Sequence, residues 1–243
     1  AKLYELKDKH VVWTAKFDEK YTDIFTLQDK ITEKISERLT TELGVSSSAL
    51  SYKQNTTSAE AYRAYSMGLS YWNMHDAKAF ENAVVQFKKA IQLDPEFVMA
   101  YAYLADTYAH TGHMSSLMSE EKAHALGEEA AKKALKLDPN CAEAMAALAL
   151  IYANRDKQTE AFELMKKSVE IKPNDAHSLH RISWMYANKG DIKKAVSEMR
   201  LAQKLDPQSA YLNQFMAEIL LLDRQLDEAI PFIEKALEIL RRV

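Results

Sequence analysis

One short motif recurs along most of this 243-residue chain: an apolar residue, a polar residue and then proline. It occurs as Leu93-Asp94-Pro95, Leu137-Asp138-Pro139, Ile171-Lys172-Pro173 and Leu205-Asp206-Pro207, and the prolines are 44, 34 and 34 residues apart. Proline ends a helix because it lacks the amide hydrogen and keeps the preceding residue out of the α region. Helices that end on a fixed period predict a stack of repeated units.

Small residues recur at fixed offsets within the last three units. A small side chain lets two helices approach closely, and larger apolar residues at helical spacing surround each small one. The pattern therefore predicts one antiparallel helical hairpin per unit. The small residues are Ala149, Ala161 and Ser168, then Ser183, Ala195 and Ala202, then Ala217, Ala229 and Ala236.

The period, the small residues and the terminal proline resemble the tetratricopeptide repeat family. The resemblance implies an all-α, right-handed superhelix of about five helix-turn-helix repeats. It covers residues 58–243, with units at about 58–95, 96–139, 140–173, 174–207 and 208–243. The second unit carries an insertion through His110 to Ser116, and its second helix is expected to start at Ser119, a favourable N-cap.

Residues 1–44 follow another pattern. Short alternating stretches around Leu3, Val11 and Trp13 predict a β-hairpin, and a helix is expected from about Asp23 until Gly44 ends it. Residues 45–57 form a polar linker. Thr57 and Glu60 are spaced for a capping box that would open the first repeat helix.

The run from Val12 to Asp29 is similar to the end of the TolB-like α/β domain that precedes tetratricopeptide arrays in bacterial multidomain signalling proteins. This resemblance implies that residues 1–44 are the C-terminal remnant of such a domain and that the chain is a piece of a longer protein. In that family the front end is a winged-helix DNA-binding domain, a kinase or an adenylate cyclase, none of which lies in this sequence.

The composition of the chain limits the classes of partner that it can bind. The formal net charge is −3, without the clustered basic face that nucleic acid requires. No apolar run is long enough to cross a bilayer. We therefore expect neither nucleic acid nor membrane to bind this fragment. The single cysteine excludes an internal disulfide but leaves a cytoplasmic and a periplasmic location both open.

In this family the first helices of the units line a concave surface that binds peptides. Among the residues that family geometry places there, no Lys or Arg occurs, which argues against an acidic C-terminal tail as ligand and favours an apolar or basic segment. Two other interpretations stay open: the aromatic residues of unit one could pack in the core, and the recurring Asn residues could be left-handed helix ends, which we favour. The predicted groove residues are Tyr62, Tyr65, Trp72, Asn73, Asn154, His177, His180, Trp184, Asn188 and Tyr211.

Motifs for chemistry are scarce, so we expect no enzyme, no cofactor and no metal. His177 and His180 share a helix face, but a metal site needs further ligands that the repeat pattern does not bring near them. Cys141 starts a helix, where a thiol pKa can fall, yet a structural role is favoured. Paired lysines on the second helices are interpreted as a solvated convex face, with a basic docking stripe as the alternative: Lys88 and Lys89, Lys132 and Lys133, Lys166 and Lys167, Lys193 and Lys194.

The last predicted helix ends the sequence with its apolar side unpaired. Solenoids need polar end caps, so either the full protein continues beyond this helix or a partner or a second copy covers its apolar side; our hypothesis is a homodimer through one of the exposed ends. The leading functional hypothesis is a non-catalytic interaction and sensing module of a bacterial signalling or regulatory protein. The alternatives are an assembly scaffold without a signalling role and the regulatory domain of a missing kinase or adenylate cyclase.

Overall fold

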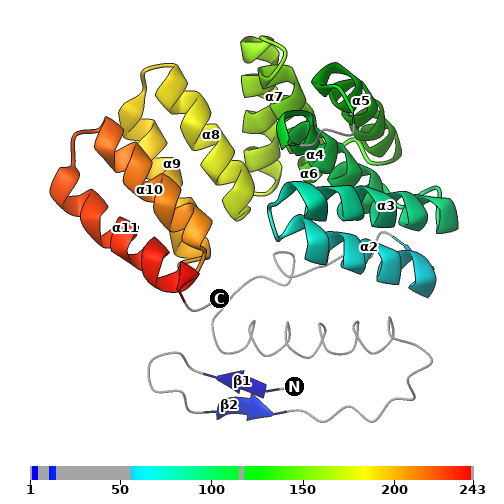
Figure 1. Cartoon of the computed structure of the whole chain (residues 1–243), viewed down its shortest axis with the longest axis horizontal. Coiled ribbons are helices and arrows are strands. Elements are labelled where there is room, and N and C mark those ends of the chain that lie inside the picture. Colours follow the sequence, from blue (N-terminus) through cyan, green and yellow to red (C-terminus); the bar gives the residue numbers. More distant parts are fainter. Residues whose placement is uncertain (1, 5–10, 15–55, 115–117, 242–243) are drawn as a thin grey trace.

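The computed structural model of the chain describes residues 2–4, 11–14, 56–114 and 118–241, and these contain ten helices arranged as five antiparallel pairs (Figure 1). Within this part of the chain the predicted all-helical repeat array is confirmed. The pairs are α2 (Ala59–Trp72) with α3 (Ala77–Leu93), α4 (Val98–Met114) with α5 (Glu120–Leu137), α6 (Ala142–Ala153) with α7 (Gln158–Ile171), α8 (Ala176–Asn188) with α9 (Ile192–Leu205), and α10 (Ala210–Leu222) with α11 (Leu226–Leu240).

Before the array, two short strands pair antiparallel, β1 (Lys2–Tyr4) and β2 (Val11–Thr14), with Leu3 opposite Trp13. The residues that join these strands, the helix predicted from Asp23 and most of the 45–57 linker lie outside the described residues. The hairpin-and-helix unit, and its assignment to a TolB-like domain, therefore stay predictions.

Polar side chains fix most helix starts. The Ser119 hydroxyl accepts a hydrogen bond from the Lys122 amide, as the sequence predicts for the N-cap of α5. At α2 the predicted cap is wrong by one residue, because Ser58 accepts from the Ala61 amide while Thr57 precedes the cap. The insertion in unit two also differs from expectation: α4 continues as helix to Met114 instead of ending near His110.

Three of the four turns between the described units use the aspartate that precedes proline, and the turn after α7 has Lys172 in its place. The carboxylate of Asp94 accepts a hydrogen bond from the amide two residues later, and Asp138 and Asp206 repeat this contact at 2.9 and 3.3 Å. Such local bonds satisfy amides that the proline-terminated helix leaves open. The recurring motif thus both ends one helix and directs the chain into the next.

The turn between the two helices of a unit contains a residue in the left-handed conformation, but this residue is not the Asn at the end of the first helix. Asn73 and Asn154 have φ values of −67° and −71°, so these helix ends are right-handed and our interpretation of them as left-handed caps is wrong. The left-handed position comes two residues later, as at His75 with φ 52° and Gly190 with φ 83°. Gly190 suits this conformation because it has no Cβ.

Small residues fill the seams between paired helices, as predicted. Ala149, Ala161, Ala195 and Ala229 are completely buried. Ser183 donates its buried hydroxyl to the Ala195 carbonyl at 2.7 Å, and Ser168 likewise donates to the Ala142 carbonyl. No helix among the described residues is both long and apolar enough to span a bilayer.

Candidate functional site

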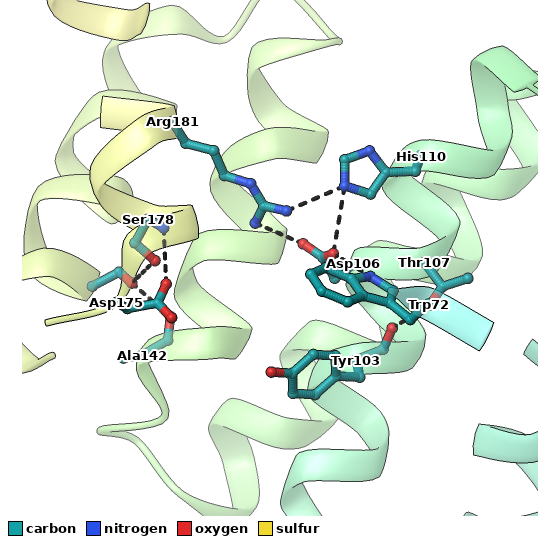
Figure 2. Close-up of polar contacts among 10 residues, drawn as sticks. Trp72, Tyr103, Asp106, Thr107, His110, Ala142, Asp175, Ser178 and Arg181 are labelled. Carbon is teal, nitrogen blue, oxygen red and sulfur yellow. Dashed lines mark hydrogen bonds and ion pairs between the residues drawn. The ribbon is translucent and has the colours of Figure 1, made fainter. Parts of the chain in front are cut away.

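A buried ion pair joins two units that are not neighbours in sequence. Arg181 extends from α8 to Asp106 of α4, where Nη1 lies 2.7 Å from Oδ1, and Figure 2 shows the two side chains meeting. The other carboxylate oxygen accepts a hydrogen bond from Trp72 Nε1 of α2 at 2.9 Å. The Arg181 and Asp106 side chains are only 12% and 7% exposed. We call Trp72, Asp106, His110 and Arg181 the concave cluster.

His110 completes this cluster. Its Nε2 lies 3.2 Å from Arg181 Nη2 and 3.5 Å from Asp106 Oδ2, so this ring nitrogen is close to both members of the ion pair. Burial alone would raise the pKa of the Asp106 carboxyl, but Arg181 and His110 together outweigh burial and hold that pKa well below its usual range. Asp106 is therefore a carboxylate at any physiological pH.

On the same surface, aromatic rings of the first unit contact rings of units that are distant in the sequence. The Trp72 ring of α2 meets the His177 ring of α8 edge-on, with centroids 5.0 Å apart. His75, in the turn after α2, stacks on Tyr211 of α10 at 5.4 Å with an interplanar angle of 6°. The first unit thus touches the fourth and the fifth. We call these two ring pairs the closure contacts.

The histidines near these contacts are held neutral. Burial, followed by the field of Arg181, lowers the pKa of His180 to about 3. Burial and then His177 lower the pKa of His75 to about 4. Burial also lowers the pKa of His177. At neutral pH His75, His177 and His180 are thus neutral, and the charge beside them is that of the Arg181 guanidinium.

The predicted groove residues fall into three groups. Asn73 and Asn188 are exposed; Tyr65, Trp72 and His180 are buried; and the remaining five, Tyr62, Asn154, His177, Trp184 and Tyr211, are half-buried. Trp72, His177 and Tyr211 come together in the cluster and the closure contacts, whereas Asn154 turns to His124 at 3.3 Å. Trp184 lies edge-on to Phe215, with no hydrogen-bond partner for its ring N–H among the described residues.

Two sequence-based expectations need correction. Tyr65 packs against Phe87, Phe97 and Tyr103, so it belongs to the core and not to the concave surface. The expected absence of Lys and Arg is also wrong, because Arg181 reaches this surface. Family positions had placed its neighbour His180 there, but not Arg181 itself. A residue one place further along the helix reaches the surface because the array curves tightly enough for α8 to face α4.

A small pocket lies beside the cluster, with a volume of about 30 Å³, room for one or two water-sized groups but not for a peptide side chain such as leucine. Asp106, Glu143, Asp175 and Arg181 supply its charged lining. Lys172 does not line the pocket, but its Nζ forms an ion pair with Glu143 Oε1 at 2.6 Å. Three carboxylates against one guanidinium make the lining acidic.

Of the sequence candidates for chemistry, His177 belongs to this site through its contact with Trp72. Cys141 is buried at the start of α6, and burial raises the pKa of its thiol to about 12 although nearby amides oppose the change. The thiol is thus protonated at neutral pH. His180 packs against Tyr211 and Phe215. In the part of the chain that the structure describes, no three His, Cys, Asp or Glu residues converge in a metal-binding arrangement.

Comparison with known proteins identifies the repeats. Two family models, both described as tetratricopeptide repeat, match residues 123–176 and 176–209. These residues are therefore tetratricopeptide repeats, as the sequence pattern predicts. No curated protein matches the chain.

Solved structures agree on the fold. A thermophilic tetratricopeptide protein of Thermus thermophilus superposes with a TM-score of 0.58 at 20% identity, covering 73% of this chain and 90% of its own. PilF of Pseudomonas aeruginosa superposes with a TM-score of 0.53 at 18% identity, covering 74% and 76%. At such identities the likeness defines the helical repeat fold and nothing more specific.

Proposed function

We propose that this chain is a non-catalytic protein-interaction module that binds a segment of another protein on its concave side. Tetratricopeptide repeats generally mediate protein–protein interaction, and they are typically not catalytic. The acidic lining beside the concave cluster supports the finer proposal that the ligand is apolar or basic. The exposed Asn73 and Asn188 and the half-buried His177 and Tyr211 are the predicted groove residues best placed to meet it.

In the free protein the closure contacts occupy this surface. A ligand therefore has to displace the ring pairs Trp72–His177 and His75–Tyr211 or to bind along their outer edge. Because the imidazoles are neutral, they oppose a cationic ligand less than protonated rings would. The carboxylates of Glu143 and Asp175 lie in the lining and attract a cation, which competes with Lys172 for Glu143.

Isothermal titration with two probe peptides tests the ligand class. We expect a twelve-residue peptide of alternating leucine and arginine to bind, and an acidic peptide with a free C-terminus to bind more weakly. Glu143→Arg should weaken binding of the basic peptide by about fivefold or more at low salt, because it reverses one charge of the lining. The matched control is Glu163→Arg, an exposed position on α7. Preference for the acidic peptide, or equal effects of the two variants, would contradict the assignment.

The regulatory context is a separate part of the proposal. It rests on the likeness of residues 12–29 to the end of a TolB-like domain, and it makes the array the sensing part of a bacterial signalling or transcription-regulatory protein. The coding sequence upstream of Ala1 distinguishes the candidates. A kinase, cyclase or winged-helix domain there supports regulation, and its absence favours the assembly scaffold.

We also propose that the chain self-associates through α11. Five large apolar side chains form one face of this helix and are between 41% and 63% exposed: Leu226, Ile230, Ile233, Leu237 and Leu240. The equivalent Val196 and Met199 of α9 are buried beneath α10. A second copy would cover the α11 face in the same way.

Sedimentation equilibrium tests this self-association. The wild type should show a dimer mass at high concentration, and Ile230→Glu should restore the monomer because it places a charge within the apolar face. Lys235→Glu on the same helix is the control and should leave the dimer intact. A monomer mass for the wild type across the concentration range would refute the proposal.

A further inference from the structure

A second groove lies on the other side of α4. Leu104 and Tyr108 of α4 form its floor, Ile91 of α3 forms one wall, and Leu126 and Ala130 of α5 form the other. Its volume is about 570 Å³, within the range of sites that hold a ligand or several anchoring side chains. Because helix positions two apart point in nearly opposite directions, Leu104 and Asp106 face away from each other. This groove is therefore separate from the concave cluster.

Unpaired lysines stand on both walls of this groove. Lys88 of α3 holds its ammonium 5.7 Å from the centre of the Tyr108 ring, directly at the groove floor. Lys133 of α5 stands on the opposite wall. Among the described residues neither lysine has a carboxylate within ion-pair distance. Among the described residues that line the groove, Glu129 is the one carboxylate and stands against two lysines, so the rim keeps a net positive charge.

The neighbouring lysines of the same two helices lie outside the groove. Lys132 is paired with Glu128 at 2.7 Å, and neither Lys132 nor Lys89 contributes to the groove. In each of these two lysine pairs of the sequence, one member thus lines the groove and the other points elsewhere. Consecutive residues of a helix point about 100° apart, so one lysine of each pair faces the groove, and these two are Lys88 and Lys133.

The polar residues on the two walls of the groove are four positions apart along their helices, the same spacing as side chains on one face of a bound helix. Lys88 and Gln92 are four residues apart on α3, and Glu129 and Lys133 are four residues apart on α5, which is about 6 Å along each axis. The buried Tyr108 hydroxyl adds a polar atom to the floor residues, without a hydrogen-bond partner among the described residues. A helix presents side chains on one face at this same spacing.

We propose that the groove between α3 and α5 binds an acidic amphipathic helix of a partner protein. Its leucine or aromatic side chains enter between Ile91 and Leu126 over Tyr108, in the manner of helix-in-groove recognition. Its aspartates or glutamates, one turn to either side, pair with Lys88 and Lys133. This partner differs in charge from the basic or apolar ligand proposed for the concave side, so the two surfaces can bind independently.

Fluorescence anisotropy with a defined probe tests this proposal. The probe is a labelled sixteen-residue helix-forming peptide with a leucine stripe flanked by glutamates, and its twin carries lysines in place of the glutamates. The test variant is the double substitution Lys88→Glu and Lys133→Glu. The matched control is Lys89→Glu with Lys132→Glu, which makes the same charge change on the same two helices outside the groove.

We expect the wild type to bind the glutamate peptide and the test variant to bind it at least about tenfold more weakly at low salt. The control variant should stay within about twofold of wild type, because its substituted residues do not line the groove. The test variant should in turn prefer the lysine peptide, which restores the charge pairs in reversed sense. Equal circular dichroism spectra and thermal midpoints of the two double variants show that folding is not the cause.

Three results would overturn the proposal: no binding of the glutamate peptide, equal binding of both peptides, or equal loss in the test and control variants. Glu143→Arg separates the two surfaces, since it should leave the glutamate peptide unaffected. A glutamate peptide that responds to Glu143→Arg but not to the Lys88 and Lys133 substitutions binds on the concave side, and the α3–α5 groove is then not its site.

Discussion

Asp106→Asn is expected to lower the free energy of unfolding by about 3–5 kcal/mol. The substitution keeps the shape of the side chain but removes the negative charge that Arg181 meets at 2.7 Å. Because the guanidinium is only 12% exposed, water cannot replace the lost partner without rearrangement of α8. Urea unfolding followed by circular dichroism measures the change.

Two further variants show whether the buried pair is the cause. Arg181→Met combined with Asp106→Asn should recover much of the loss, because the uncompensated cation is then gone. Glu228→Gln is the matched control, since it breaks an Arg–carboxylate pair at 2.6 Å that is about 40% exposed, and it should cost far less than Asp106→Asn because solvent screens an exposed pair. A cost for Asp106→Asn as small as that of Glu228→Gln would show that the pair does not hold the array together.

Gly68→Ala is expected to destabilise the first unit by about 1–3 kcal/mol, although alanine is the better helix former. A Cβ at this position would lie 2.5 Å from Phe87 Cε1. Phe87 cannot move aside freely, because its ring is fully buried between Tyr65 and Tyr103. Overpacking therefore outweighs the gain in helix propensity, which is about 1 kcal/mol.

A second substitution that removes side-chain volume opposite the new methyl group tests this explanation. Gly68→Ala combined with Phe87→Leu should be more stable than either single variant, because the smaller side chain makes room for the methyl group. Ser70→Ala, on the exposed side of α2, should be nearly neutral. A Gly68→Ala protein as stable as wild type in thermal unfolding would mean that α2 and α3 can separate without cost.

Local sequence signals were sufficient to predict the helical hairpins. The prolines mark the ends of the second helices, and Ala149, Ala161 and Ser168 lie buried in a seam as their spacing requires. The start of α5 after Ser119 followed from a capping preference. Each of these features depends on residues within one unit, which is why a single sequence contains enough information to locate them.

The concave cluster depends on contacts between units, and these were not predictable in the same way. Arg181 and Asp106 meet only because the curvature of the whole array brings α8 opposite α4. The stacking of His75 on Tyr211 has the same origin. Curvature accumulates from small rotations at every unit, so no local pattern specifies it. The burial of Tyr65 follows likewise from its packing against Phe97 and Tyr103 beyond its own helix.

The contact between α4 and α8 skips a whole unit, and this changes how the array can come apart. In an open solenoid each unit touches only its neighbours, so the stability is a sum of local terms and the ends can unfold first. Here Asp106 and Arg181 link the second unit to the fourth, and His75 and Tyr211 link the first to the last. The terminal units thus share contacts with each other, and loss of either end weakens the opposite one. Opening of the array becomes a concerted event, with the two ends released together.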